Sequence, residues 1–420
     1  MKKKIGVSAI LFTMLILLIA CMDNTKRNEE EHLQDDINKK EEIKTQRDEI
    51  KELIDSMSIN EKIGQLMIVG FNGTSVDENI NDLIKTSYIG GVILFGNNVE
   101  SLNGVTELIN NIKLSNMNNK IPLFISVDEE GGVVSRTPNE FLKLPSSLSI
   151  GAYNNKEMCY EVGEIIANEL KLMGYNMDYA PVLDILSNPN NTVIGSRAFG
   201  RDADIVSNLG ISVMKGINEN NVIPVVKHFP GHGDTSVDSH YGLPLVEKSL
   251  NELKELEFIP FQNAINSGAD AIMVSHILLK NIDSENPATM SKKIVSDILR
   301  DEMNFKGVVI SDDMTMAAIM DNYDIGEASV KAINAGVDII LVCHGYDNEI
   351  KVLTSISEAV NSGEITEERL DESVYRILSL KNKYDLSDTT KMNSIGIEEI
   401  NNKINNLLKK KLTKFLIIFS

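Results

Sequence analysis

Short apolar runs alternate with longer amphipathic segments along most of the chain. From about residue 57, eight runs rich in β-branched and aliphatic residues follow one another, at residues 65–71, 90–95, 122–128, 177–185, 222–228, 271–276, 307–312 and 337–343. The segments between them repeat apolar residues every three or four positions and end at glycine, as residues 156–174 and 249–268 do. The pattern predicts eight strands separated by helices.

The composition of the predicted strands indicates the type of sheet. Strands that are apolar almost throughout are typical of parallel sheets that are covered on both faces. Eight strand and helix units over roughly 300 residues are typical of a (β/α)8 barrel of the TIM type. We therefore expect an α/β fold with one such barrel as its single large domain, and a doubly wound open sheet is the alternative.

Polar residues that can carry charge follow directly on, or close, several of these runs. Active sites of (β/α)8 barrels lie at the carboxyl ends of the strands, so such residues are expected around one mouth of the barrel. They are Asp128, Asp184, Lys227, His228, His276 and Asp312. An aspartate after a strand also often caps the next helix, and for Asp184 and Asp313 both roles stay open.

The first 21 residues have the pattern of an export signal. Lysines at positions 2–4 precede an apolar run over about residues 5–20, which is too short for a comfortable bilayer span and ends at Ala20-Cys21. The ending LIAC resembles a bacterial lipobox, which implies acylation of Cys21. Ordinary cleavage and an uncleaved anchor are the alternatives. We expect the protein to lie outside the cytoplasm, attached to the cell membrane through Cys21.

Changes in composition divide the chain into four segments. Residues 1–20 are the predicted signal peptide, and residues 21–50 form a tether that is rich in both signs of charge and becomes helical near residues 46–56. The barrel domain is expected over residues 51–386. Residues 387–420 are too few for a further α/β domain, so this tail is predicted to be a natural end, a remnant helix or a truncated second domain.

Charge and cysteine content narrow the classes of function. The formal net charge is −20 and the isoelectric point is about 4.8, which opposes binding to nucleic acid because no basic surplus is present to displace counterions from phosphate. The three cysteines, at positions 21, 159 and 343, fit neither a disulfide framework nor a C-x-x-C metal site. Cys159 and Cys343 are most simply small core residues.

The polar segment KHFPGHGDTSVDSH, residues 227–240, holds three of the six histidines. A zinc site from His228 and His232 would need a helix, which Pro230 and the neighbouring glycines interrupt, and no nearby cysteine or helical glutamate completes a ligand set. The G-x-x-x-x-G-K-[ST] phosphate-binding pattern is absent. The sequence therefore predicts a mobile loop and neither a metal nor an organic cofactor.

An acid/base pair is the remaining interpretation of this loop. Residues two apart in an extended stretch point to the same side, so the Asp238 carboxylate can hydrogen-bond the His240 ring. Such a partner fixes the tautomer and raises the basicity of His240, which can then donate and take up a proton near neutral pH.

Asp312 is the candidate partner of this acid/base pair. A carboxylate held at the end of a barrel strand can attack an anomeric carbon and form a glycosyl-enzyme intermediate, and the two-step displacement retains configuration. Asp313 is the alternative. Consecutive residues on a strand point in opposite directions, and Asp313 begins the departing loop, so Asp312 is preferred.

Several ordered motifs together resemble one known family. Besides KHFPGHGDTSVDSH they are MSINEKIGQLMIVGF (57–71), SVDEEGGVVSR (126–136), IGSRAFG (194–200), AIMVSHI (271–277), PATMS (287–291) and VVISDDMTM (308–316). Over roughly residues 55–386 the chain is similar to the catalytic barrel of the β-N-acetylglucosaminidases of glycoside hydrolase family 3. The loop with its terminal DSH is the most specific of these motifs.

The resemblance implies a role for each matching residue. Asp312 would be the nucleophile, His240 the acid/base and Asp238 the residue that polarises it. Terminal GlcNAc would be held by Asp128, Arg136, Arg197, Lys227 and His228. His232 and His276 are assigned to positioning, and the arginines could also brace the mouth through ion pairs with Asp128 or Glu130. Glu129 and Val133 depart from the glutamine and arginine that are frequent in the family.

The expected function is that of an exo-acting, retaining β-N-acetylglucosaminidase in a bacterial lipoprotein form. It would remove terminal GlcNAc from peptidoglycan fragments during cell-wall turnover, or from other β-linked oligosaccharides. Two alternatives stay open. One is a β-N-acetylglucosaminide phosphorylase that uses the same site. The other is a non-catalytic, lipid-anchored sugar-binding receptor, against which the presence of both Asp312 and the Asp238/His240 pair argues.

Overall fold

A computed structural model of the chain describes residues 44–235, 238–239, 242–389 and 396–418, with side chains up to residue 410 in the last segment. The predicted signal peptide, Cys21 and most of the tether lie outside these residues. The chain divides into two compact units, Met1–Ser56 and Met57–Ser420. In the first unit, residues 44–56 form a helix.

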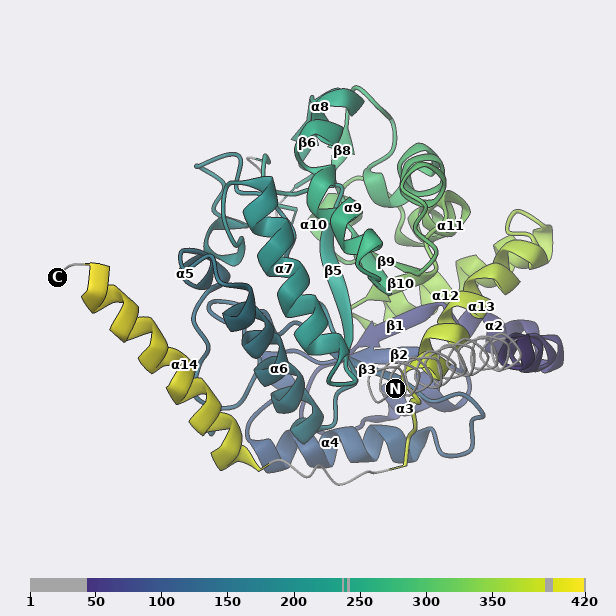
Figure 1. Cartoon of the computed structure of the whole chain (residues 1–420). Helices are drawn as coiled ribbons and strands as arrows, with labels where there is room; N and C mark the ends of the chain where they lie inside the picture. The colour runs from purple at the N-terminus through teal and green to yellow at the C-terminus, as the bar shows by residue number, and fades with distance from the viewer. Residues whose placement is uncertain (1–43, 236–237, 240–241, 390–395, 419–420) are drawn as a thin grey trace, which may run out of the picture. The chain divides into compact units, whose positions relative to one another are not determined.

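Eight parallel strands of the second unit close into a barrel (Figure 1). Each strand pairs with the barrel strands before and after it in the chain, and the last pairs with the first. The strands are β1 (Met67–Gly70), β2 (Gly91–Ile93), β3 (Phe124–Val127), β4 (Met177–Asp178), β5 (Ile223–Phe229), β7 (Ala271–Val274), β9 (Val308–Asp313) and β10 (Ile339–Val342). Each matches one of the eight predicted runs, although β5 and β9 extend one residue beyond theirs, and the predicted (β/α)8 barrel is confirmed.

Helices connect the strands and cover the outside of the barrel (Figure 1). The longer ones are α2 (Ile59–Gln65), α3 (Glu78–Lys85), α4 (Leu102–Ser115), α6 (Lys156–Met173), α7 (Ala203–Asn218), α9 (Phe258–Asn266), η4 (Lys293–Glu302), α11 (Ile325–Ala335), α12 (Tyr346–Ser362) and α13 (Glu367–Lys383). Helix α6 matches its predicted range. The Asn155 side chain accepts from the Met158 N–H at its start, and Gly174 adopts a left-handed conformation at its end.

Two predicted elements differ from the observed ones, and a proline accounts for each difference. The helix expected over residues 249–268 is broken at Leu256 into α8 (Leu250–Glu255) and α9. Pro260 has no N–H to donate to the Leu256 carbonyl, four residues earlier. The strand expected over residues 177–185 is regular only at its first two residues. Pro181 interrupts the ladder, which resumes as a single bridge at Val182.

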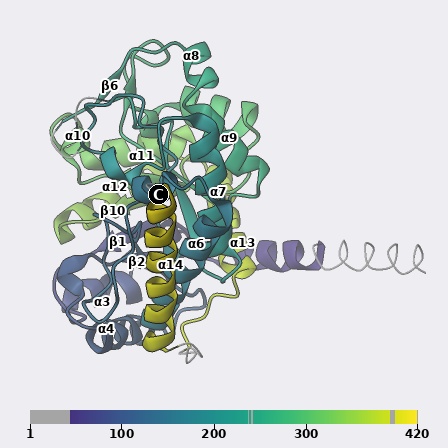
Figure 2. The same ribbon diagram turned by 60° about the vertical axis from the view of Figure 1, so that its left-hand side comes forward.

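A small two-stranded sheet and one long helix lie outside the barrel. Strand β6 (Leu245–Val246) pairs with β8 (Leu278–Leu279), which fixes the far end of the loop that follows β5. Helix α14 (Ile397–Ile418) runs along α6, and Lys403 and Lys410 pair with Glu164 and Glu161 at 2.8 and 2.7 Å (Figure 2). Across the described residues, no helix combines the length and the apolar character that a bilayer span requires.

Buried charges close the amino end of the barrel. Asp338 directly precedes β10 and is fully buried, and its carboxylate accepts from Arg300, from Arg376 at 3.0 Å and from the Ser373 hydroxyl at 2.8 Å. Burial alone would raise the pKa of Asp338, but the surrounding arginines hold it below its usual range. Asp338 is therefore a buried anion that joins β10 to α13.

Lys381 of α13 is buried at the amino end of the barrel, where the first three strands begin. Its Nζ donates to Gln65 Oε1 and to the Gly90 carbonyl, both at 2.8 Å, and lies 4.5 Å from the centre of the Phe124 ring. Burial lowers the pKa of Lys381 to about 7. Helix α13 thus supplies buried cationic groups to this end of the barrel.

Candidate active site

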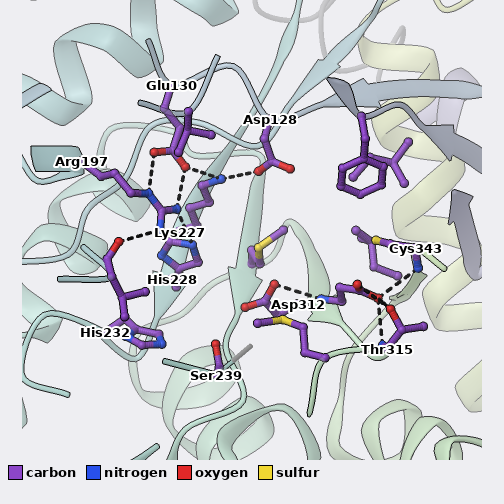
Figure 3. A pocket seen from close by; sticks show the side chains of 18 of the residues that line it. Asp128, Glu130, Arg197, Lys227, His228, His232, Ser239, Asp312, Thr315 and Cys343 are labelled. Atoms are coloured by element: carbon purple, nitrogen blue, oxygen red, sulfur yellow. Dashed lines mark hydrogen bonds and ion pairs between the residues drawn. The ribbon is translucent and has the colours of Figure 1, made fainter. Parts of the chain in front are cut away.

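A pocket of about 330 Å³ opens at the carboxyl end of the barrel (Figure 3). This volume is near the lower limit of the roughly 300–1,000 Å³ found for small-ligand pockets, so it suits a ligand the size of one sugar residue. The predicted site residues that line it are Asp128, Arg136, Arg197, Lys227, His228 and Asp312. The fold therefore brings together side chains from the segments after β3 and β4 with residues of β5 and β9.

An alternating chain of charges forms one wall of the pocket (Figure 3). The Lys227 ammonium lies 2.5 Å from Asp128 Oδ1 and 2.8 Å from Glu130 Oε1. The guanidinium of Arg197 donates two hydrogen bonds to Glu130, at 2.7 and 2.8 Å. Burial would raise the pKa of Glu130, but Lys227 and Arg197 outweigh it and hold this pKa well below its usual range. Glu130 is thus a fixed anion between two cations.

Asp184 fixes His228, the next residue of this wall, through a hydrogen bond. It is fully buried, and the Nδ1–H of His228 donates to its Oδ2 at 2.6 Å. The helix-capping alternative for Asp184 is wrong, because its Oδ1 accepts instead from the backbone N–H of His232 at 2.6 Å. Burial opposes ionisation of Asp184, but the two histidines lower its pKa. Arg197 Nη2 donates to His228 Nε2 at 3.3 Å, which selects the tautomer with the proton on Nδ1.

Lys227 and His228 both line the pocket although they are neighbours in β5. In a regular strand, consecutive side chains point to opposite faces. The pairing of β5 with β7 changes register between Val226 and Phe229, so the strand is irregular at these two residues. Because of this irregularity, two consecutive side chains of β5 contribute to the same wall of the pocket.

Glu129 organises the loop that follows β3. Its carboxylate accepts from the backbone N–H groups of Gly131 at 3.2 Å, Arg136 at 2.6 Å and Thr137 at 3.2 Å. The loop thereby places Glu130 and Arg136 at the pocket. Burial raises the pKa of Glu129, and burial and the nearby Glu129 charge also raise that of Glu169.

Asp312 and Asp313 both contribute to the pocket wall, in contrast to the expectation that they point in opposite directions. The two aspartates differ in their hydrogen bonds. Asp313 Oδ1 accepts from the N–H of Thr315 at 2.9 Å and from that of Cys343 at 3.0 Å, so Asp313 joins β9 to the end of β10. Asp312 accepts from the Asp313 N–H at 2.9 Å and is half-buried beside the cavity. Asp313 thus has a structural role between two strands, and the assignment of Asp312 as nucleophile stays a prediction.

The loop after β5 returns to the same pocket. Gly231 has φ +123° and lies against Glu257, where a Cβ atom would be 2.9 Å from that side chain. Farther along, buried Ser239 lines the pocket beside Asp312, and its carbonyl accepts from the Ala318 N–H at 3.1 Å (Figure 3). Asp238 is half-buried, while His240 lies outside the described residues. The predicted Asp238/His240 contact stays a prediction.

The comparison with family models decides which family the chain belongs to. Residues 58–380 match the model described as the glycosyl hydrolase family 3 N terminal domain, which is most of the chain. The chain belongs to glycoside hydrolase family 3. The resemblance inferred from the motifs is thus confirmed at the level of the family.

Curated relatives of this family 3 protein carry β-hexosaminidase names. Beta-hexosaminidase A of Pseudoalteromonas piscicida is 34% identical over 334 residues, which cover 74% of this chain and 56% of that protein. Beta-hexosaminidase of Nitrosomonas eutropha is 32% identical over 327 residues, which cover 76% of this chain and 92% of that protein. The chain therefore spans little more than half of the first relative and nearly all of the second.

Among solved structures, a family 3 β-N-acetylglucosaminidase from Paenibacillus sp. superposes with a TM-score of 0.81 at 37% identity. The match covers 85% of this chain and 69% of the Paenibacillus chain. The family 3 barrel is therefore shared across most of both chains.

Some functional groups of this family 3 site were not identified from sequence. The sequence indicates Glu130 only as a possible brace for the arginines, yet Glu130 bridges Arg197 and Lys227, which are 67 and 97 residues away. For Asp184 the sequence leaves two roles open. The one signal available was position, because both residues follow an apolar run, as the assigned residues do.

Proposed function

We propose that this family 3 member is an exo-acting, retaining β-N-acetylglucosaminidase, that is, a β-hexosaminidase. It would remove terminal non-reducing GlcNAc from peptidoglycan fragments and other β-linked oligosaccharides. The observation that carries the proposal is the position of Asp312 in a small pocket, opposite a wall of buried ionic groups and beside Ser239 of the DSH segment. The names of the relatives support the hexosaminidase activity.

The proposed reaction has two steps. In the first, a carboxylate oxygen of Asp312 bonds to the anomeric carbon while the bond from that carbon to the leaving oxygen breaks, and His240 gives its proton to this oxygen. In the second, His240 takes a proton from water, and the water oxygen displaces Asp312 from the same carbon. Two inversions give net retention, and both the proton and the carboxylate are restored.

The charged wall supplies the proposed grip on the sugar. Asp128 is the outermost anion of this wall, with 23% of its side chain exposed, and it can accept hydrogen bonds from sugar hydroxyls. Lys227, Arg197 and His228 are held by carboxylates that are themselves buried, so their directions are set before substrate arrives. Groups held in place in advance lose little free energy to reorganisation during the reaction.

Turnover of 4-methylumbelliferyl β-N-acetylglucosaminide tests the proposal. The wild type, Asp312→Asn, Asp313→Asn and His240→Ala are compared at equal folded concentration. We expect Asp312→Asn to lower kcat by at least about a thousandfold, because the nucleophile is lost, and Asp313→Asn to lower it much less. Proton NMR of the first product should show the β anomer, and added phosphate should not divert the product to GlcNAc 1-phosphate.

Two outcomes would overturn this assignment. Equal turnover by the wild type and Asp312→Asn would remove Asp312 from the reaction. An α anomer as the first product would exclude a two-step displacement. Saccharide binding by a wild-type protein that shows no turnover would instead support the receptor alternative.

We further propose that the protein is anchored outside the cytoplasm through an acylated Cys21. Support comes from residues 1–21 alone, in which a basic start and an apolar run lead to a lipobox-like ending. Expression with an alkyne-bearing fatty acid should label the wild type but not Cys21→Ser. Labelling of both proteins, or of neither, would refute the anchor.

A further inference from the structure

His232 is a buried histidine that lines the pocket and is held by three neighbours. It is 2% exposed, and its backbone N–H donates to Asp184 at 2.6 Å. Its carbonyl accepts from Asn191 Nδ2 at 2.8 Å, and its ring Nδ1 lies 2.7 Å from Thr235 Oγ1. The backbone and one edge of the ring are therefore fixed.

The second ring nitrogen of His232, Nε2, differs from Nδ1 in its contacts. Within residues 44–235, 238–239, 242–389 and 396–418, Nε2 is buried and has no hydrogen-bond partner. His276 provides a comparison, because its Nδ1 is also 2.7 Å from a threonine hydroxyl, that of Thr289, but its Nε2 donates to the Asp313 carbonyl at 3.0 Å. Buried polar atoms in proteins are nearly always paired, and His232 lines the pocket, so its open nitrogen is available to a bound ligand.

His232 lies close to two other residues of the pocket lining, His228 and Asp312. Its ring lies edge-on to that of His228, with 6.0 Å between the ring centres, and in Figure 3 it lies on the Ser239 side of His228. Burial lowers the pKa of His232 and the nearby His228 lowers it further, while the carboxylates of Asp184 and, to a smaller extent, Asp312 act in the opposite direction. The ring is thus a neutral group on the pocket wall beside His228, within electrostatic reach of Asp312.

We propose that His232 Nε2 hydrogen-bonds the 2-acetamido group of the terminal sugar and makes His232 a specificity-determining residue. The inference rests on the proposed function, in which C1 lies at Asp312 and His228 faces the ring hydroxyls farther round the sugar. Carbon 2 is bonded to C1, so its substituent would lie in the same small cavity, whose lining includes the buried His232. A neutral imidazole offers one hydrogen bond, which suits an amide better than an ion.

The test compares substrates that differ only at C2. The wild type, His232→Ala, His232→Gln and the control His276→Gln are assayed on the 4-methylumbelliferyl β-glycosides of GlcNAc and of 2-deoxyglucose. For His232→Ala, kcat/KM on the GlcNAc glycoside should fall by about tenfold to a hundredfold, whereas that on the 2-deoxy glycoside should change little. His232→Gln, which keeps a hydrogen-bonding group, should recover part of the loss. His276→Gln should affect both substrates alike.

A second readout separates this inference from the proposed function. Calorimetry gives the affinities of free GlcNAc and 2-deoxyglucose for each variant, whether or not the protein hydrolyses glycosides. His232→Ala should weaken the binding of GlcNAc and leave that of 2-deoxyglucose unchanged. Equal losses for both sugars, in rate and in affinity, would show that His232 only supports the loop and would overturn the inference. Absence of wild-type turnover would count against the proposed function alone.

Discussion

The two ends of the barrel both contain buried charges, but these charges face different surroundings. At the amino end, Asp338 is enclosed by arginine side chains and by the Ser373 hydroxyl. At the carboxyl end, Glu130 is enclosed in a similar way by Lys227 and Arg197, yet the chain of charges continues to Asp128 at the pocket. The first network ends within protein, and the second ends at a cavity.

This difference predicts different consequences for the same kind of change. Removal of one partner from an enclosed ionic network leaves an uncompensated buried charge, and the cost appears in the free energy of unfolding. A charge that borders a cavity can regain water or ligand, so its loss appears mainly in binding and catalysis. Substitutions at each end therefore test whether the two networks differ in this way.

The largest effect is expected for Asp338→Asn. The substitution leaves the surrounding arginines without their shared anion and should lower the free energy of unfolding by about 3–5 kcal/mol. Thermal and denaturant unfolding measure this loss. Arg376→Met is the matched control, because one cation is removed while Arg300 stays paired with Asp338, and its effect should be smaller. Well below the melting temperature, kcat per folded molecule should be unchanged. A stable but inactive Asp338→Asn would contradict the proposed separation of roles.

Asp128→Asn should have the opposite profile. The substitution removes an anionic acceptor from the pocket, and kcat/KM on a GlcNAc glycoside should fall by about a hundredfold, or about 2.7 kcal/mol. The melting temperature should change by only a few degrees, because the side chain is partly exposed and Lys227 keeps Glu130 as a partner. Steady-state kinetics and thermal unfolding of the same preparation test both statements. A loss of stability as large as that of Asp338→Asn would show that the carboxyl end is equally enclosed.

The same contrast explains what could be predicted from sequence. The eight strands were found because each is a continuous apolar run, and Asp128, Lys227 and Asp312 because they end such runs. This signal is local. The residues with which these side chains interact are not adjacent to them in the sequence. Only the folded structure therefore shows the bridge that Glu130 forms, the pairing of Asp184 with two histidines and the role of Glu129.

Lys381 allows the amino end to be probed by pH. Its pKa is about 7 in the folded protein against an ordinary value of 10.5, so above pH 7 the folded state loses this proton before the unfolded state does. Stability should therefore rise with pH in this window, by about 1 kcal/mol from pH 7 to 8. Lys381→Met lacks this contribution. The difference in unfolding free energy between the two proteins should follow that rise, and a difference independent of pH would refute the assignment.

Glu129 should give the smallest effect, with the opposite sign. Burial raises its pKa above the ordinary value of 4.5, so above that pH the unfolded state loses this proton first, and stability falls as pH rises. Glutamine at this position keeps an acceptor for the N–H groups of Arg136 and Thr137 and does not ionise. Glu129→Gln should therefore gain stability relative to the wild type between pH 5 and 8, by less than about 1 kcal/mol.

The control for this last prediction is Glu255→Gln, which makes the same chemical change at an exposed position. Kinetics add a second measurement. If the Glu129 hydrogen bonds hold the loop that carries Arg136, the glutamine variant should keep the wild-type KM, whereas Glu129→Ala should raise it. A pH-dependent gain in stability with an unchanged KM would show that the carboxyl end has a buried carboxylate whose ionisation opposes folding and contributes nothing to substrate binding. A raised KM in the glutamine variant would instead show that the negative charge of Glu129 is itself needed at the pocket.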